Sequence, residues 1–435
     1  MQIKTFFGWV LISIFSFLPV LAWFILGPGF TEFQGYSSIT HSLGKLFGLV
    51  GMSMFALTFI LSMRLKIIEK IFNGLDKVYI AHGVLGGLAL FFILLHPLFL
   101  VLKFIPSSFY LAAKYLLPSA DWSVNFGIIA LFGLSLLIAI TLFFKIKYEK
   151  WKFSHKFLGL VFILAVIHIF WIRISFVTDG IFEGYYLYAA IVSITGLVGF
   201  FYTLFLKNII LKEKAYRISS INKKGNVFEI FMVPKGKPIK YEKGQFIFVQ
   251  FNNRQLSLEP HPFSLASSSN SEEIKIFIKK LGDFTAKLDV LKVGDLVEIE
   301  GPYGMFSKST NKKDQVWIAA GIGITPFISM ASDLIGKNSS KKIDLIYTAR
   351  EDSEFIGNEV FSKLSNENKN FKCFFWNSQQ KGRLNIKIIS EIVGNLKDKE
   401  FFVCGPSLFK EGITKELLSK KITKKNIHEE AFEFK

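Results

Sequence analysis

The chain has 435 residues, of which 51% are hydrophobic and 16% aromatic, and this composition is too apolar for an average soluble protein. The formal net charge of +18 would favour nucleic-acid binding in a soluble protein. Many of the basic residues cluster beside apolar segments, however, so a lipid bilayer is the expected partner and nucleic acid is not. Cys373 and Cys404 are the only cysteines. They imply neither a disulfide framework nor a thiolate metal site, and they indicate a reducing compartment for their half of the chain.

Six segments in roughly the first 210 residues are long and apolar enough to cross a membrane. The first resembles a signal peptide, but its apolar run is too long and no small-residue cleavage site follows, so we expect an uncut anchor. Basic residues gather between spans two and three, between spans four and five, and after span six. This bias predicts a plasma-membrane protein whose N-terminus and C-terminal half face the cytosol. The predicted spans cover about residues 6–26, 41–63, 79–102, 123–144, 155–176 and 185–206.

Two of these spans each carry a pair of histidines. His82 and His96 lie fourteen residues apart in the third span, and His155 and His168 lie thirteen apart in the fifth. At about 1.5 Å per residue the gaps are about 21 Å and 20 Å, so the four imidazoles fall on two matching levels. We interpret them as axial ligands of two haems stacked across the bilayer, with His82 and His155 as the inner pair. The alternative is polar residues hydrogen-bonded inside a helix bundle, which is uncommon at membrane depth.

The angular spacing of the two histidine pairs differs. At about 100° per residue, fourteen residues return to within about 40° of the starting face, whereas thirteen miss it by roughly 140°. We therefore expect the fifth span to be locally over- or underwound, or to meet its two haems from different sides. Glycines that follow the inner pair would let a flat macrocycle lie close to the backbone. They are Gly83, Gly86, Gly87 and Gly159.

Three further polar residues, His41, Lys45 and Arg173, lie near the outer ends of the spans. They are candidates for neutralising the propionates of the outer haem or for holding an acceptor molecule. The alternative is that their side chains reach for the membrane interface.

After Lys214 the periodicity changes from helical to short alternating runs. Runs such as GNVFEIFMV, GQFIFVQF and EIKIFIKKL predict a small antiparallel β-barrel that ends near residue 307. An apolar strand, a glycine turn and a helix then begin a parallel α/β pattern. The expected fold class is a multi-domain membrane protein, in which an all-α six-helix transmembrane bundle precedes a two-domain module. We place the domains at residues 1–210, 214–310 and 314–435.

Glycine turns in both soluble domains indicate nucleotide phosphate sites. Gly321 and Gly323 at a strand-to-helix junction allow a pyrophosphate to approach backbone N–H groups, and Pro326 fixes φ early in the helix. Gly282 and Thr285 offer backbone and hydroxyl donors for a second pyrophosphate in the barrel. One phosphate site in each domain implies two nucleotides, a flavin and a nicotinamide.

Basic residues near two strand ends of the α/β domain bear on the choice of nicotinamide nucleotide. Arg350 ends the second strand, where the ribose of a dinucleotide would lie, and Lys381 and Arg383 are nearby in sequence order. Guanidinium groups suit a 2′-phosphate, which favours NADPH. Each of these residues equally fits a solvated surface charge, so NADH stays possible.

With these motifs in this order, the chain resembles the ferric reductase and NADPH oxidase superfamily, flavocytochromes b with six membrane helices and a cytosolic ferredoxin-reductase-like module. The histidine spacings match those of the family's two b-type haems. The run His261-Pro262-Phe263-Ser264 resembles the family's flavin-binding motif, and Gly282 and Thr285 resemble its flavin pyrophosphate site.

The same resemblance assigns nicotinamide-binding roles in the α/β domain. Gly321, Gly323, Thr325 and Pro326 are similar to the family's nicotinamide phosphate loop. The resemblance also implies that Cys404, Gly405 and Pro406 lie beside the nicotinamide and that Phe434 stacks on the flavin. The expected cofactors are FAD, two b-type haems and NADPH.

The resemblance implies electron transfer across the membrane to an acceptor on the outer face. Oxygen, giving superoxide, is the first choice of acceptor, and a ferric chelate is the alternative. Animal oxidases of the family carry a further histidine where this chain has Leu100, which argues against an animal-type oxygen pocket. The chain resembles the compact prokaryotic NADPH oxidases, so no obligatory protein activator is expected. A haem or nucleotide sensor, or an ion pathway without turnover, is the alternative from another class.

Overall fold

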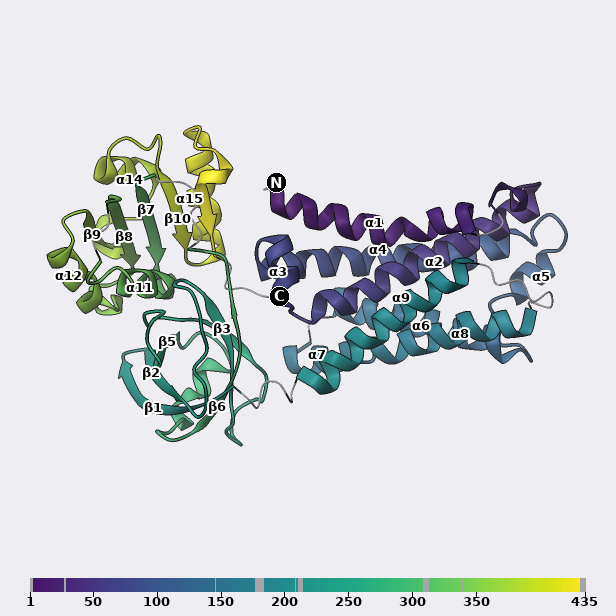
Figure 1. The fold of residues 1–435 in the computed structure, drawn as a ribbon, viewed down its shortest axis with the longest axis horizontal. Coiled ribbons are helices and arrows are strands. Elements are labelled where there is room, and N and C mark those ends of the chain that lie inside the picture. Colours follow the sequence, from purple (N-terminus) through teal and green to yellow (C-terminus); the bar gives the residue numbers. More distant parts are fainter. Residues whose placement is uncertain are drawn as a thin grey trace. The chain divides into compact units, whose positions relative to one another are not determined.

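A computed structural model describes residues 3–26, 29–144, 146–176, 184–207, 209, 214–307, 313–337 and 340–430. The chain forms two compact units, Met1–Lys207 and Asn208–Lys435. The first unit is a bundle of helices, and the second contains all the strands of the described residues (Figure 1).

Six of the described helical segments are long and apolar enough to cross a membrane, which confirms the six predicted spans. They are α1 (Ile3–Leu26), α2 (Tyr36–Ser62), α4 (Leu75–Leu102), α6 (Trp122–Phe143), α7 (Tyr148–Lys156) with α8 (Leu158–Phe176), and α9 (Gly184–Phe201). The short elements are η1 (Gly29–Glu32), α3 (Lys66–Phe72), α5 (Phe109–Lys114) and η2 (Tyr202–Leu206). In Figure 1, α3 and α7 lie at one end of the bundle and α5 lies at the other.

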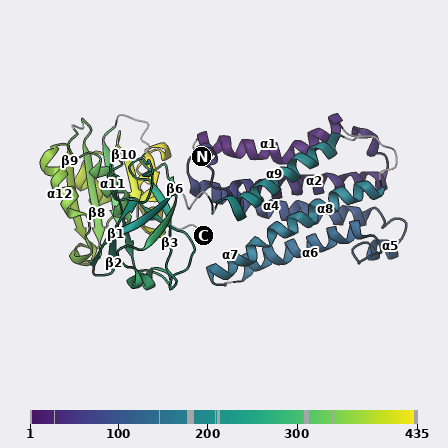
Figure 2. The same cartoon turned by 60° about the horizontal axis from the view of Figure 1, so that its bottom comes forward.

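Small residues bring the helices of the bundle close together. A Cβ atom on Gly51 of α2 would lie 2.6 Å from Ile93 of α4, and one on Gly196 of α9 would lie 2.3 Å from the Phe162 ring of α8. Lipid provides no hydrophobic force between helices, so close packing at small residues contributes much of their association. Helix α2 contacts α1, α4 and α9, and α6 contacts α8 (Figure 2).

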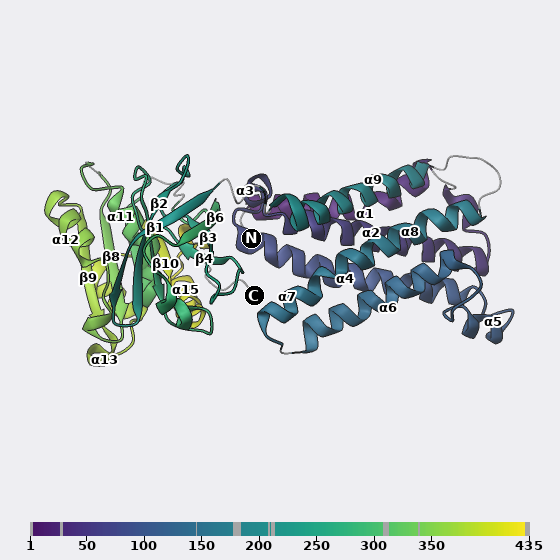
Figure 3. The ribbon, with the colours of Figure 1, turned by 90° about the horizontal axis from the view of Figure 1, so that it is seen from below.

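The fifth span is interrupted between its two histidines. Helix α7 ends at Lys156, the N–H of Phe157 donates to the Ser154 carbonyl at 3.0 Å, and α8 begins at Leu158. A bond from residue i to residue i−3 winds the backbone to about 3.0 residues per turn. This tighter turn is in the direction of the expected overwinding, but it gains only about 20° per residue and so accounts for part of the angular mismatch. Figure 3 shows α7 and α8 following one another along α6.

The first half of the second unit is a six-stranded antiparallel barrel. Its spatial order is β4 (His261–Ser264), β3 (Phe246–Phe251), β6 (Leu296–Tyr303), β1 (Ala215–Lys224), β2 (Val227–Pro234) and β5 (Ile274–Lys279). A bridge between Leu265 and Ile276 joins the two edges and curls the sheet closed. Apolar side chains from alternate strand positions fill the interior, among them Tyr216, Ile230, Val249 and Val297. The predicted barrel is confirmed.

The second half is a five-stranded parallel sheet with helices on both faces. Its order is β11 (Ile427–Glu429), β10 (Glu400–Cys404), β7 (Gln315–Ala320), β8 (Ile343–Ala349) and β9 (Phe371–Asn377). One apolar core includes α11 (Thr325–Ser332) and α12 (Asn358–Glu367), and another includes α14 (Ile386–Val393) and α15 (Ser407–Ser419). The strand order reverses between β7 and β10, and ligands of such sheets bind outside the carboxyl ends of the strands at this reversal.

The barrel and the α/β domain share an apolar core and a buried polar network. Phe306, just after β6, packs edge to face on Phe327 of α11. Beside this core, the Asp333 carboxylate accepts hydrogen bonds from Ser268 Oγ at 2.7 Å, from the Ser269 N–H at 2.7 Å and from Ser269 Oγ at 2.6 Å. One carboxylate at the end of α11 thus ties the β4–β5 loop to the α/β domain.

Replacing Asp333 by alanine should loosen this junction. The three donors would lose a charged acceptor in a mostly buried place, so the free energy of unfolding of the second unit should fall by about 2–4 kcal/mol. The measurement is the melting temperature of that unit in the purified full chain, expected to fall by roughly 4–10 °C. Glu411→Ala, an exposed change on α15, is the control and should alter stability by less than about 0.5 kcal/mol. Equal melting temperatures for the two variants would contradict the role of Asp333.

Candidate functional site

The four histidines of the membrane helices come together in the two predicted pairs. The ring centres of His82 on α4 and His155 on α7 lie 6.2 Å apart, and those of His96 on α4 and His168 on α8 lie 6.3 Å apart. Each pair joins α4 to the interrupted fifth span. The spacing along the sequence and the pairing across the bundle therefore agree.

Three of these imidazoles are oriented by backbone carbonyls of neighbouring helices. The Nδ1-to-oxygen pairs are His82 with Thr58 (3.0 Å), His96 with Gly44 (2.8 Å) and His168 with Ser123 (2.8 Å). A carbonyl can only accept, so Nδ1 carries the proton and Nε2 keeps its lone pair for a metal. Hydrogen bonds of this kind fix the ring orientation of a metal-binding histidine and raise its basicity.

His155 is held differently from the other three histidines. Its ring lies 5.1 Å from the Trp151 ring, centre to centre, at an interplanar angle of 31°. Its Nδ1 atom is buried and has no hydrogen-bond partner among the described residues. Packing against the tryptophan therefore orients this ring where a carbonyl orients the others.

Glycines of neighbouring helices make room for the rings of the second pair. A Cβ atom on Gly48 of α2 would lie 2.8 Å from Nδ1 of His96. One on Gly127 of α6 would lie 2.6 Å from the His168 ring. A side chain at either position would push an imidazole away from its carbonyl acceptor.

The glycines that follow the first pair fall into two groups. Gly83, Gly86 and Gly87 have no outside atom within 4 Å of a Cβ position, so the face of α4 beside His82 is open. Gly159 instead lies against the Phe200 ring, which a Cβ atom would approach to 1.9 Å. The backbone of α4 therefore leaves open space of the kind expected beside a flat macrocycle. At Gly159 the corresponding space is filled by the Phe200 ring.

The histidine pairs fit the axial ligation of two haems. A metal ion about 2 Å from each of two facing imidazole nitrogens would separate the ring centres by about 6 Å, close to the two observed separations. The described residues contain no group of three or more His, Cys, Asp or Glu side chains placed to hold a metal ion. Iron in a planar macrocycle needs only two axial ligands from the protein, so pairs of histidines suffice.

The bundle end nearest the second pair carries two of the polar residues singled out above. His41 and Lys45 lie one helical turn apart on α2, and the Lys45 Nζ atom is 5.8 Å from the centre of the Trp23 ring. The Arg173 side chain lies outside the described residues. Leu100 is buried, and a Cβ on Gly44 would lie 2.9 Å from it. An apolar side chain therefore occupies the position where animal oxidases have a histidine.

The two predicted flavin motifs meet at the barrel. The run His261-Pro262-Phe263-Ser264 forms β4, which pairs with β3. The His261 ring stacks on Phe284, with ring centres 3.6 Å apart and an interplanar angle of 22°. Phe284 directly precedes Thr285. The His261–Ser264 strand and the turn that contains Gly282 and Thr285, about twenty residues apart in sequence, therefore lie side by side.

Two hydroxyl groups of the flavin motifs, those of Ser264 and Thr285, differ in their hydrogen bonds to the protein. The Ser264 hydroxyl is buried and has no partner among the described residues. A buried hydroxyl without a protein partner fits a hydrogen bond to a bound polar group. The Thr285 Oγ1 accepts from the Leu281 and Gly282 N–H groups at 2.9 Å and 3.0 Å. In this structure Thr285 therefore orders its own turn, and its predicted contact with a pyrophosphate stays a prediction.

The predicted nicotinamide loop lies at the carboxyl end of β7. Gly321 has φ +54°, which favours glycine, and nothing lies within 4 Å of a Cβ position there. A Cβ on Gly323 would lie 2.6 Å from the Cys404 carbonyl oxygen and 2.7 Å from Gly405 Cα. The Thr325 hydroxyl donates to the Ile322 carbonyl at 2.8 Å and closes the turn. Pro326 stands in the first turn of α11.

The segments after β7 and β10 therefore touch at the reversal of the strand order. β10 pairs with β7 in parallel, Cys404 lies opposite Ala319, and Gly405 and Pro406 lead into α15. The Cys404 side chain is fully buried, and burial raises the pKa of its thiol well above the usual range. At neutral pH Cys404 is thus an uncharged thiol rather than a thiolate nucleophile.

The predicted 2′-phosphate residues lie at the ends of β8 and β9. Arg350 follows β8, and its carbonyl accepts from the Gln379 N–H at 3.2 Å. Gln379 belongs to α13 (Ser378–Lys381), which follows β9 and is itself followed by Arg383. Arg350, Lys381 and Arg383 are all exposed. The fold thus brings the two segments together and leaves their cations accessible to a ligand.

Phe434 lies outside the described residues. The last described residue, Glu430, donates from its N–H to the Val403 carbonyl at 3.4 Å, directly beside Cys404. Its own carbonyl accepts from Lys410 Nζ at 2.7 Å.

Some residues of the site were not predicted from the sequence. Gly44 and Gly48 face His96 from α2, and their spacing of four, typical of close helix contacts in membranes, was an available signal. Phe284 is an aromatic residue in a loop, and nothing in its local sequence indicates that it stacks on a distant histidine.

Three family models match successive parts of the chain. A ferric reductase like transmembrane component matches residues 47–166, an FAD-binding domain matches 212–307 and an oxidoreductase NAD-binding domain matches 317–415. Fold and domains thus define a membrane protein with a ferredoxin-reductase-like FAD and NAD module. The chain belongs to the ferric reductase and NADPH oxidase superfamily.

Relatives agree with this assignment over parts of their length. Respiratory burst oxidase homolog protein D of Arabidopsis thaliana is 33% identical over 188 residues, which cover 36% of this chain and 19% of that protein. Ferric reduction oxidase 8, mitochondrial, of the same plant is 32% identical over 165 residues, which cover 33% of this chain and 22% of that protein. The chain spans about 60% or less of the length of the curated relatives it matches.

A solved flavohemoglobin from Malassezia yamatoensis, with bound FAD and heme, is similar in fold. It has a TM-score of 0.50 at 16% identity and covers 92% of this chain and 98% of its own chain. At this identity the likeness concerns the fold alone.

Proposed function

We propose that this chain is a transmembrane NADPH oxidase that moves electrons from cytosolic NADPH, through FAD and two b-type haems, to an acceptor on the outer face. The observation that carries the proposal is the pairing of four histidines at two levels of the bundle, in a chain that also has FAD-binding and NAD-binding domains. FAD converts the electron pair of a hydride into single electrons, and bis-histidine haem transfers electrons one at a time.

The protein's own groups hold and orient these cofactors. The four Nε2 atoms are the ligand positions, and the carbonyls of Thr58, Gly44 and Ser123 keep three of the rings in place. If a haem bound between each histidine pair, both protein ligands would come from histidine, and an acceptor would have to receive electrons without binding iron. In the cytosolic module, the Ser264 hydroxyl and the His261–Phe284 stack would contact the flavin, and the neutral Cys404 thiol would lie beside the nicotinamide.

The first choice of acceptor is oxygen, which would give superoxide, and a ferric chelate is the second. The buried Leu100 leaves no histidine beyond His96 on that helix face, whereas the Lys45 ammonium supplies positive charge that would favour an anionic chelate. Arg350 and Arg383 are accessible cations for a 2′-phosphate, which supports NADPH over NADH. The bias of basic residues toward these loops favours a cytosolic N-terminus and module, and the proposed location is the plasma membrane.

The acceptor can be identified with detergent-purified protein supplied with FAD. We expect rapid NADPH consumption, and in air a cytochrome c reduction that superoxide dismutase abolishes. Reduction of cytochrome c that is insensitive to the dismutase, together with fast ferric-chelate reduction without oxygen, would instead establish a ferric reductase. Binding of NADPH without its consumption would contradict both and favour a sensor.

A further inference from the structure

A cavity of about 350 Å³ lies between the nicotinamide loop and the flavin barrel. On the α/β side it is lined by Gly321 and Ile322 and by the loop after β8. On the barrel side it is lined by Lys279 and by the tip of the β1–β2 hairpin, which begins at Lys224. It therefore opens where a dinucleotide's phosphates would meet the N–H groups of the Gly321 turn.

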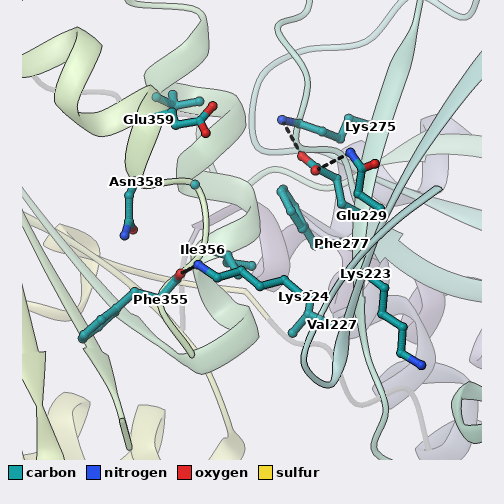
Figure 4. Close-up of a pocket in the computed structure, with 13 residues that line it drawn as sticks. Lys223, Lys224, Val227, Glu229, Lys275, Phe277, Phe355, Ile356, Asn358 and Glu359 are labelled. Carbon is teal, nitrogen blue, oxygen red and sulfur yellow. Dashed lines mark hydrogen bonds and ion pairs between the residues drawn. The ribbon is translucent and has the colours of Figure 1, made fainter. Parts of the chain in front are cut away.

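A second cavity, of about 220 Å³, adjoins the first. Lys224, Val227 and Ile356 line both cavities. Figure 4 shows Lys224 extending from the hairpin to the Phe355 carbonyl oxygen, which it reaches at 2.9 Å. The side chain thus crosses from the flavin domain to the α/β domain and forms part of the wall between the two cavities.

Lys224 differs from its neighbouring lysines in the group that its ammonium contacts. Lys223 is paired with Asp289 at 2.8 Å, Lys275 with Glu229 at 3.2 Å and Lys279 with Glu354 at 3.4 Å. Lys224 has no carboxylate partner among the described residues and donates to a neutral carbonyl. A charged amine gains much more from a phosphate than from a carbonyl. The four-carbon stem of a lysine also lets its amine change partners without any movement of the backbone.

We propose that Lys224 binds the pyrophosphate of the nicotinamide dinucleotide, exchanging the Phe355 carbonyl for a phosphate oxygen when the nucleotide enters the larger cavity. The inference rests on the proposed use of a nicotinamide nucleotide. A barrel residue would then hold the nucleotide against the α/β domain. Because the pyrophosphate is common to NADH and NADPH, the contact serves both and is separate from Arg350 and Arg383.

The test compares Lys224→Gln with Lys223→Gln in the purified full chain. Lys223 is the adjacent lysine, loses the same charge, and points away from the bridge to Phe355 in Figure 4. The KM values for NADPH and NADH are measured with a soluble dye that accepts electrons from the flavin. Lys224→Gln should raise both KM values about tenfold with kcat unchanged, because it removes one charge-assisted contact that is present throughout the reaction. Lys223→Gln should change them less than about twofold.

Direct binding of ADP, which carries the pyrophosphate but no nicotinamide, is measured by calorimetry on the same proteins. A Kd about tenfold weaker for Lys224→Gln alone would support the proposal even if turnover were absent, so failure of the proposed function remains distinguishable. The proposal would be overturned if the two substitutions had equal effects or if Lys224→Gln changed the KM for NADPH only. It would also be overturned if the unsubstituted chain did not bind ADP, or if Lys224→Gln bound ADP as tightly as the unsubstituted chain.

Discussion

Leucine in place of His96 is expected to remove about half of the haem absorbance and to leave reduction of the flavin by NADPH within about twofold of the unsubstituted protein. His96 faces His168 at 6.3 Å and donates to the Gly44 carbonyl, so leucine would remove one of two axial ligands at that level. Loss of an outer-shell partner of a metal ligand costs roughly 10- to 100-fold in affinity or activity. Loss of the ligand itself should reduce transfer to the outer acceptor by at least as much.

The matched control is Phe109→Leu, a change to the same residue at an exposed position of α5. It should keep the full haem absorbance, because Phe109 has no part in either histidine pair. The measurement is the haem content per protein, from the absorption spectrum, together with the rates of flavin reduction and acceptor reduction. An unchanged spectrum in His96→Leu would refute the assignment of His96 as a ligand.

The same logic predicts a different result at the first pair. His82→Leu should also halve the haem content, but it would remove the cofactor between the flavin and the remaining haem. Reduction of that haem by NADPH should then be lost, whereas in His96→Leu the remaining haem should still be reduced. This contrast tests the order of the electron path.

Alanine in place of Gly323 should abolish nucleotide-dependent flavin reduction. Its Cβ would lie 2.6 Å from the Cys404 carbonyl oxygen and 2.7 Å from Gly405 Cα, and both are backbone atoms. The turns after β7 and β10 would have to separate, and a displacement of about 1 Å in a reacting geometry costs roughly 100-fold in rate. The overpacking should also lower the free energy of unfolding by about 1–3 kcal/mol.

Two glycines of the same domain provide controls for Gly323. Gly412→Ala on the exposed face of α15 meets no atom within 4 Å and should stabilise that helix by up to about 1 kcal/mol. Gly321→Ala meets no atom either but keeps φ at +54°, so it should cost about 1–2 kcal/mol with a smaller loss of rate. Stopped-flow reduction of the flavin by NADPH is the measurement. A rate for Gly323→Ala equal to that of Gly412→Ala would contradict the packing argument.

Local patterns in the sequence were sufficient for the elements and for the pairing of the histidines. Six apolar runs matched the length of a bilayer, alternating runs produced β-strands, and spacings of fourteen and thirteen placed the four imidazoles on two levels. Such features depend on the rise per residue and on hydrophobic period, which neighbouring residues determine by themselves.

Contacts between distant segments were decided only by the tertiary structure. The sequence predicted a distortion of the fifth span, and the structure locates a tighter turn at Phe157, between α7 and α8. The carbonyl acceptors of the histidines, the stacking of His261 on Phe284 and the bridge from Lys224 to Phe355 join residues 20 or more positions apart. No local propensity encodes such pairs, because each forms only when two separately stable elements pack together and their buried polar groups must find partners.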